Sequence, residues 1–460
     1  MKEAVFDSIT NINKILKNEC GITDEMDRII LTAGCLVLCR YDRNAITKIM
    51  ASDPPLSDFM SDASALFDSI SDSDNASAIA ALRTEFSLVR YREVDNVTGK
   101  LLSAVVSVSD YINSDEYNGE DLMAVLFMEF SRSGGKSDAG QIFTPSHIGR
   151  LICRVINVGS SDKVLDATCG SGSLLTSAIS CGVDTSNLYG IELYDKLSVL
   201  ASANMLMRNG GISHILNEST LSDAACAFIR NSHITKAILN PPYERKYKCA
   251  DIVCSVLDNV EPGTVCAFIL PDKKFEKESK LKKALNRHTL TTIIKLPEDL
   301  FFNVGVTTSI FILKAGEPQN GASIAGYYIE DDGFETIKNK GRLDIKDKWS
   351  AIEDYWVNAI QSGDDAEYDT RQDINPSERL SYKLPEKPFE IREEDFTASL
   401  VNYECYKKGI DIKALRESIA DAVLYRSQMI NTPDGIVIFV PGGFDVHGEN
   451  LCGTVIGDGE

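Results

Sequence analysis

The sequence predicts an α/β protein with a doubly wound sheet in its middle and helical regions on either side. Three observations support this fold class. Between about residues 136 and 318, short β-rich apolar runs alternate with helix-length intervals, which is typical of buried parallel strands. Before residue 135 the apolar residues recur at helical spacing, with few β signals. After residue 381 the helical pattern returns.

Five regions are expected along the chain. They are a helical N-terminal domain (1–135), the α/β domain (136–318), an extension of that domain (319–360), an acidic linker (361–380) and a C-terminal helical region with a tail (381–460). The linker is expected because QSGDDAEYDTRQDINPSE is acidic and has no apolar period. The pattern assigns no element to residues 431–460.

The strands of the α/β domain are expected to be short. They are predicted at 163–167, 189–193, 236–240, 265–271, 291–297 and 306–315, and the third strand along the chain is expected within the stretch ISHILNESTL. We interpret them as parallel strands, so their carboxyl ends should meet at one edge of the sheet. Ligands of open α/β sheets bind at that edge.

The composition excludes several classes of protein. The longest apolar run is too short to cross a membrane, and the N-terminus lacks the pattern of a signal peptide. The twelve cysteines form no CxxC pair, which indicates idle thiols in a reducing cytoplasm and no metal site. The net charge of −21 is unusual for a protein that binds DNA alone, so any DNA contact requires locally concentrated basic residues or a partner.

A glycine-rich turn follows the first expected strand. Asp166 ends that strand, and Gly170 and Gly172 follow in the stretch DATCGSGS. Glycines let the backbone pass close beneath a ligand, and a helix N-terminus favours electron-rich groups. The stretch lacks the Lys of a P-loop and contains only half of a GxGxxG fingerprint. A carboxylate before the glycines suits a ligand with a positive charge, such as an amino or sulfonium group.

A second acidic residue, Glu192, ends the next strand 26 residues after Asp166. An acid at this point hydrogen-bonds the ribose hydroxyls of bound nucleosides. The two acids and the glycines together favour a cationic nucleoside such as S-adenosylmethionine. The expected cofactor contacts from these two segments are Asp166, Thr168, Gly170, Gly172, Ser173, Glu192 and Leu193.

The stretch KAILNPPY ends the fourth strand in a stiff turn, because Pro241 and Pro242 cannot donate backbone hydrogen bonds. The side-chain oxygen of Asn240 and the carbonyl of Pro241 can both accept hydrogen bonds from a planar exocyclic amine. Two acceptors favour a more sp³-like nitrogen and direct its lone pair at an electrophile. Tyr243 offers a face on which a base can stack. The predicted catalytic residues are therefore Asn240, Pro241, Pro242 and Tyr243, acting by positioning and electrostatics.

These motifs resemble those of the N6-adenine DNA methyltransferases. GQIFTP (140–145) resembles the element that those enzymes place over the methionine end of the cofactor, which implies that Phe143, Thr144 and Pro145 contact it. LPEDLF (296–301) and GVTTSI (305–310) resemble their late motif. The stretch from Tyr117 to Pro145 resembles the interdomain segment of modification subunits in type I restriction systems. The motif order is that of the γ class, and the likeness runs from about 115 to 315.

The resemblance implies a methyltransferase with a Rossmann-like fold that uses S-adenosylmethionine and modifies N6 of adenine in DNA. Two departures stand out. Ala167 replaces the proline that the family usually has after the aspartate, and the position that contacts the cofactor's adenine is either Asn217 or Glu218. We expect Glu218 there.

The resemblance also implies that the target adenine is flipped out of the duplex. Tyr243 would stack on it, and Phe301 or Phe302 would flank it. Lys246 and Lys273 are expected to contact DNA; both belong to basic stretches, which alternatively are ordinary solvated surface.

The chain leaves little length for a target-recognition domain, so recognition is expected from a separate specificity subunit docked on the helical ends, with a restriction subunit as a further partner. Three alternatives remain: a stand-alone adenine methyltransferase, a protein glutamine N5-methyltransferase, and an inactive scaffold or nucleic-acid-binding module of the same fold. The glutamine methyltransferases also have NPPY, but they lack the FTP and LPxxxF motifs.

Overall fold

The computed structural model describes residues 3–71, 74–117, 121–131, 144–208, 211–301, 305–337, 341–365, 367–384 and 393–416, with four short strands nearer the C-terminus. The chain divides into two compact units, residues 1–383 and 384–460. The expected boundary at 135/136 is therefore not a boundary between compact units, whereas the one expected at 380/381 lies three residues from the division.

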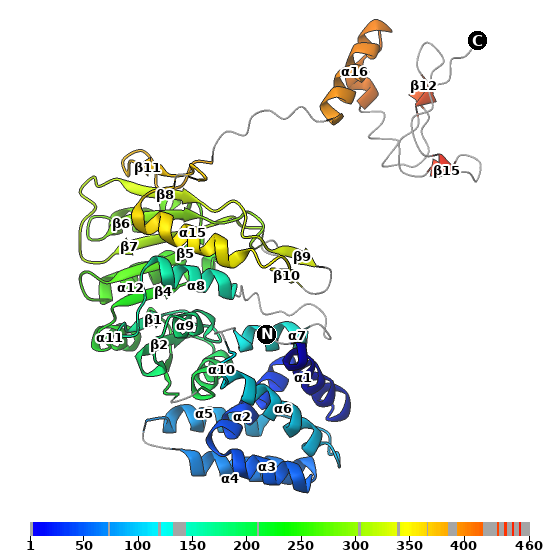
Figure 1. The fold of residues 1–460 in the computed structure, drawn as a ribbon. Coiled ribbons are helices and arrows are strands. Elements are labelled where there is room, and N and C mark those ends of the chain that lie inside the picture. The colour runs from blue at the N-terminus through cyan, green and yellow to red at the C-terminus, as the bar shows by residue number, and fades with distance from the viewer. Residues whose placement is uncertain are drawn as a thin grey trace. The chain divides into compact units, whose positions relative to one another are not determined.

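A nine-stranded sheet forms the centre of the first unit (Figure 1). Its strand order is β11-β8-β6-β7-β5-β4-β1-β2-β3. β1 pairs in parallel with both β2 and β4, so the order of the chain reverses beside β1. The strands are β1 (Val164–Asp166), β2 (Leu188–Glu192), β3 (His214–Asn217), β4 (Lys236–Leu239), β5 (Val265–Pro271), β6 (Thr289–Lys295), β7 (Thr308–Lys314), β8 (Ile324–Tyr328) and β11 (Gln372–Ile374).

The predicted strands are confirmed, but the prediction that all are parallel is wrong for β7. β7 lies between β5 and β6 and runs antiparallel to both. No helix lies between β6 and β7 in the described residues, so the chain turns back directly instead of crossing over the sheet.

The expected acidic linker is also wrong in part, because β11 lies within it and pairs with β8 at the edge of the sheet. Ile374 is fully buried there, while Arg371 and Asp373 form an exposed ion pair. A strand of three residues with one buried apolar side chain is too short to show a period in the sequence.

Helices cover both faces of the sheet (Figure 1). One apolar cluster joins the sheet to α8 (Ser146–Val155), α9 (Ser173–Ile179) and α15 (Trp349–Ser362). The other joins it to α11 (Asp223–Asn231), α12 (Cys249–Asn259), α13 (Lys274–Lys277) and α14 (Ser279–Ala284). This two-sided cover explains why the strands are apolar on both faces.

The predicted N-terminal helices are present. They are α1 (Glu3–Lys14), α2 (Glu25–Tyr41), α3 (Arg43–Ser52), α4 (Leu56–Ile70), α5 (Ala76–Leu88), α6 (Thr98–Ile112) and α7 (Leu122–Ser131). They share their core with α10 (Asp195–Leu206), which is buried from Leu197 to Leu206. Ala201 and Met205 of α10 belong instead to a cluster against the sheet, so one helix that is buried on all sides joins the two layers.

The second unit contains helix α16 (Glu393–Lys407), which agrees with the predicted helical pattern. Residues 417–429 of the second expected helix lie outside the described residues. Two strand pairs follow, β12 (Ile430–Asn431) with β13 (Val437–Ile438) and β14 (Phe444–Asp445) with β15 (Asn450–Leu451). Among the described helices of the chain, none has the length and apolarity needed to cross a membrane. The cysteines in the described part are free thiols.

Candidate functional site

The two acids predicted to bind a nucleoside lie side by side at the carboxyl edge of the sheet. Asp166 and Glu192 end the adjacent parallel strands β1 and β2, and only 2% and 7% of their surfaces are exposed. The carboxylate of Glu192 accepts hydrogen bonds from the backbone N–H of Gly170 (2.8 Å) and of Tyr194 (2.9 Å). Glu192 therefore also fixes the glycine loop in place.

The surroundings of Asp166 fit a cationic ligand. Its Oδ1 accepts hydrogen bonds from the backbone N–H and hydroxyl of Thr168 (3.0 and 3.4 Å), whereas Oδ2 has no donor among the described residues. Burial, and then the neighbouring Glu192, raise the pKa of Asp166 to about 7. The buried hydroxyl of Ser171 likewise has no partner in the described part of the chain. A positively charged group with hydrogen-bond donors would satisfy this carboxylate.

The glycine loop leaves space for a ligand above it. Gly170 has φ +55°, and a Cβ added there would meet no atom within 4 Å. Gly172 precedes α9 with φ +91°, outside the region that other residues tolerate. Asn204 of α10 supports the turn from below by donating to the Ser171 carbonyl at 3.0 Å.

Substitutions at the two glycines should have different effects. We expect Gly170→Ala to cost only about 1–2 kcal/mol of unfolding free energy but to weaken S-adenosylmethionine binding, because its methyl group would enter the open space above the loop. Gly172→Ala should cost about 2–3 kcal/mol. Denaturant unfolding and calorimetric titration measure both effects. Gly263→Ala, at φ +92° in an open turn before β5, is the control for backbone strain without a ligand. Unchanged cofactor affinity in Gly170→Ala would contradict this interpretation of the loop.

The two candidates for the adenine contact differ in their hydrogen bonds. The side chain of Asn217 donates to the Glu192 carbonyl at 3.0 Å, so it is already used within the protein. Glu218 is exposed, and its carboxylate accepts only from the backbone N–H of Ser219 (3.2 Å). The arrangement is compatible with the expectation for Glu218, which stays a prediction.

The Asn240 side chain is held at both ends. Its Nδ2 donates to the Thr144 hydroxyl at 3.0 Å, and its Oδ1 accepts from the Tyr243 hydroxyl at 2.6 Å. Because the amide nitrogen points at Thr144, the carbonyl oxygen is the end left to accept from a substrate. Asn240 follows β4, next to β1, so it stands on the strand neighbouring Asp166.

The remainder of the NPPY turn offers a second acceptor and a ring. The carbonyl of Pro241 has no donor among the described residues, although the residue itself is buried. Pro242 and Tyr243 are half-buried. Burial, and to a lesser degree Cys249, raise the pKa of Tyr243 above its usual value, so its hydroxyl stays protonated and donates.

Thr144 had been expected to contact the cofactor, and its contact with Asn240 was not predicted from the sequence. The two residues are 96 positions apart, and a single sequence carries no signal for such a pair. Pro145 stands immediately before α8. Phe143 lies outside the described residues, as does Phe302.

Two further predicted cofactor contacts and one predicted substrate contact differ in how much of their surface is exposed. Ser173 is buried and begins α9, beneath the glycine loop. Leu193 is 50% exposed beside Glu192 and is therefore accessible to a ligand. Phe301 is only 6% exposed and belongs to the same core cluster as Leu300, and its contact with a substrate stays a prediction.

Many of the basic residues expected to contact DNA are already paired with acids. Lys246 lies 3.0 Å from Glu244, and its ammonium group stands over the Tyr247 ring. The second basic stretch, called here the basic run, consists of Lys273, Lys274, Lys277, Lys280, Lys282, Lys283 and Arg287. Three pairs join it to nearby acids: Lys274–Glu278, Lys280–Asp251 and Arg287–Asp258. Lys273 is exposed and has no ion pair within the described ranges. The structure thus shows acid-paired surface for three of the seven cations of this run, whereas Lys273, Lys277, Lys282 and Lys283 have no ion pair within the described ranges.

Comparisons with known proteins identify a family and several relatives of the chain. The model of the N-6 DNA Methylase family matches residues 120–267 and 253–403. The type II restriction enzyme and methyltransferase RM.BcgI of Heyndrickxia coagulans is 31% identical over 250 residues, covering 48% of this chain and 39% of that protein. The type I restriction enzyme MpnII methylase subunit of Mycoplasma pneumoniae is 24% identical over 379 residues, covering 71% of this chain and 65% of that one. The chain thus spans less than two thirds of either relative.

Two solved structures have a similar fold. One, from a study of complex assembly and conformational transition in the type I R-M system, superposes with a TM-score of 0.60 at 16% identity, covering 93% of this chain and 99% of that one. The other, a type I restriction-modification methyltransferase subunit from Streptococcus thermophilus, superposes with a TM-score of 0.54 at 15% identity, covering 82% of this chain and 96% of that one. At these identities the likeness is one of fold.

Proposed function

The chain belongs to the N-6 DNA methylase family, and from this premise we propose that it transfers a methyl group from S-adenosylmethionine to N6 of adenine in double-stranded DNA. The observation that carries the proposal is the Asn240 carboxamide, held in one orientation on the strand next to the buried carboxylate of Asp166. The site of action is the cytoplasm, where the genomic DNA is found.

The protein's part in the reaction is to prepare the amino group. The N6 nitrogen of adenine is a poor nucleophile because its lone pair is delocalised into the ring. Hydrogen bonds from its two protons to Asn240 Oδ1 and the Pro241 carbonyl draw the nitrogen towards a tetrahedral geometry and direct its lone pair. S-adenosylmethionine, when bound, supplies an electrophilic methyl group on a sulfonium. No strong base is needed, because the proton leaves only as positive charge develops on nitrogen.

Tyr243 has two tasks in this proposal. Its ring would stack on the adenine after the base has left the duplex. Its hydroxyl donates to the same oxygen of Asn240 that would accept from the amine. A carboxamide oxygen has two lone pairs, so it can accept both hydrogen bonds at once.

The direct test is methyl transfer from labelled S-adenosylmethionine to adenine-containing DNA. Mapping of N6-methyladenine in host genomic DNA, with and without the gene, would identify the modified site. Label recovered in protein instead of DNA, or no label at all in a folded and cofactor-loaded complex, would contradict the proposed function.

The chain is further proposed to act as the modification subunit of a type I-like complex, with a specificity subunit that selects the site and a restriction subunit as a possible third component. Helix α16 supports this because it exposes large apolar side chains. Phe396, Leu400 and Tyr403 are 70%, 56% and 60% exposed and are spaced at i, i+4 and i+7 on one face of the helix. An exposed apolar face of this kind marks an interaction site.

Charges on this helix face should prevent assembly. We expect the double substitution Leu400→Glu and Tyr403→Glu to abolish co-purification with the specificity subunit, because two carboxylates would be buried in an apolar interface. S-adenosylmethionine affinity should not change. Asn402→Glu adds one carboxylate to α16 away from this face and serves as the control. If the double variant still assembles, or if the chain alone methylates a defined site with full efficiency, this part of the proposal fails.

A further inference from the structure

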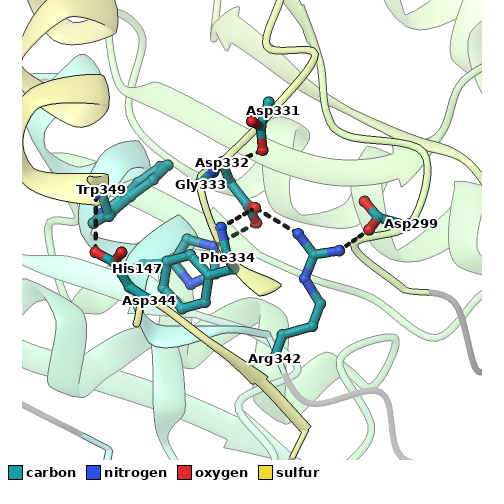
Figure 2. A network of polar contacts seen from close by, with 9 residues as sticks. All are labelled: His147, Asp299, Asp331, Asp332, Gly333, Phe334, Arg342, Asp344 and Trp349. Carbon is teal, nitrogen blue, oxygen red and sulfur yellow. Dashed lines mark hydrogen bonds and ion pairs between the residues drawn. The ribbon is translucent and has the colours of Figure 1, made fainter. Parts of the chain in front are cut away.

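The Asp332 carboxylate, beyond β8, is the centre of a network of polar contacts (Figure 2). It is fully buried. Its Oδ2 lies 3.2 Å from His147 Nε2, while its Oδ1 lies 2.5 Å from Arg342 Nη2 and accepts from the backbone N–H of Phe334 at 3.0 Å. Burial raises the pKa of Asp332, but the hydrogen bond from His147 leads a set of interactions that leave it below its usual value. The group is therefore a carboxylate that accepts from both sides.

The first arm of this network reaches the catalytic amide. His147 is the second residue of α8, three residues after Thr144, which accepts the hydrogen bond from Asn240. The His147 ring stacks on Phe334, with centroids 4.0 Å apart, and meets the edge of Trp349 at 4.7 Å. Pro145 between them has a fixed φ, which removes one rotatable backbone bond between Thr144 and the start of α8.

The second arm reaches the late motif. Arg342, in β10 (Gly341–Leu343), is 11% exposed and forms ion pairs with both Asp332 and Asp299. Asp299 belongs to LPEDLF, two residues before Phe301. The guanidinium fork of Arg342 is needed for this bridge because it presents separate N–H groups to two carboxylates. β10 pairs with β9 (Glu335–Ile337), which directly follows the Asp332 turn.

We propose that Asp332 and Arg342 are positioning residues, which hold the Thr144–Asn240 contact and the LPEDLF loop in one fixed arrangement. The inference rests on the proposed function, which makes Asn240 the group that receives the substrate amine. It assigns a positioning task to Asp332 and Arg342, which lie outside the strands and turns that carry the recognised motifs. The amine is directed correctly only while the Asn240 carboxamide keeps its orientation, which depends on its contact with Thr144.

The variants are chosen to cut each arm separately. Asp299→Asn removes the charge of the exposed outer link, and Arg342→Lys keeps the charge but loses the fork. Asp332→Asn removes the charge shared by both contacts and replaces one of the two acceptor oxygens with a donor. Thr144→Val removes the acceptor for Asn240, and Thr144→Ser restores it. Arg28→Met is the stability control, because Arg28 is buried in the N-terminal helices with carbonyl partners and does not contact the network.

Two measurements test the proposal, both on the full chain assembled with its specificity subunit. In steady-state kinetics with host genomic DNA, we expect Asp299→Asn, Arg342→Lys and Asp332→Asn to lower kcat by about 10- to 100-fold, with KM for S-adenosylmethionine within twofold of the original. Thr144→Val should lower kcat similarly and Thr144→Ser should restore it. The double variant Asp299→Asn and Asp332→Asn should have the same kcat as Asp332→Asn alone, because both substitutions disrupt the same chain of contacts.

Asp332→Asn should accelerate hydrogen exchange of the backbone amides in both 146–150 and 296–301, whereas Asp299→Asn should accelerate exchange only in 296–301. Arg28→Met should change neither. If the original protein is inactive on DNA, the proposed function fails, while the exchange experiment still tests the network. If the original protein is active and Asp299→Asn and Asp332→Asn leave kcat and both exchange patterns unchanged, the positioning role is wrong.

Discussion

Asn240→Ala is expected to lower kcat for adenine methylation by about 10³-fold or more, the largest effect of any single substitution in the site. The substitution removes the oxygen that accepts from the reacting amine and the nitrogen that donates to Thr144. S-adenosylmethionine affinity should stay within twofold, because Asp166 and Glu192 hold no contact with this side chain. Single-turnover methyl transfer measures the rate, and calorimetric titration measures the affinity.

Two variants separate the two ends of the Asn240 amide. Asn240→Asp keeps the acceptor but loses the donor to Thr144, so its activity should lie between those of Ala and Asn. Tyr243→Phe keeps the ring and removes only the donated hydrogen bond, so its activity should fall much less than that of Asn240→Ala. An Asn240→Ala protein that retains a tenth of the original kcat would contradict the proposed role.

The second large effect is a pH-dependent cofactor affinity that depends on Asp166. Because the pKa of the buried Asp166 is raised to about 7, the carboxyl group is protonated below that pH and must lose its proton when a cation binds. Binding lowers this pKa. The dissociation constant for S-adenosylmethionine should therefore rise as pH falls below about 7, by up to tenfold per unit, and should level off above pH 7. Calorimetric titration between pH 5.5 and 8.5 checks this.

Asp166→Asn should raise the dissociation constant by about 30-fold or more at pH 8, because it removes the charge that faces the cation. It should also remove most of the pH dependence. The pKa of Glu192 is also raised by burial, so its titration accounts for any change of the dissociation constant with pH that remains in this variant. A wild-type affinity that is constant between pH 6 and 8 would show that the Asp166 carboxyl does not face the cationic group.

The parts of the fold that could be predicted from the sequence are those set by local pattern. Apolar runs located the strands, and Asp166, Gly170 and the NPPY turn stand at the ends of strands that are adjacent in the sheet. The apolar pattern of the sequence could not reveal β11, because Ile374 is the only core residue of that strand. Nor could it reveal that β7 inserts between β5 and β6, since strand order depends on packing across the whole sheet.

Long-range side-chain pairs were the other features that the sequence left open. His147 and Asp332 are 185 positions apart, and nothing near either residue indicates the contact. The basic run is another case in which contacts between residues distant in the sequence could not be predicted. Lys280 and Arg287 stand in a stretch with few acids, but Asp251 and Asp258 of α12 lie against them in space. Local charge therefore overstated the positive surface.

Those ion pairs have a consequence for the approach to the chromosome. With several cations compensated and an overall charge of −21, the long-range field of the isolated subunit repels a polyanion. If the chain acts in the proposed assembly, each collision of the isolated subunit with the double helix is expected to be brief, and lasting occupancy to depend on positive charge contributed by the partner subunits. A copy without those subunits is then expected to leave genomic adenines unmarked, without any inhibitor to restrain it.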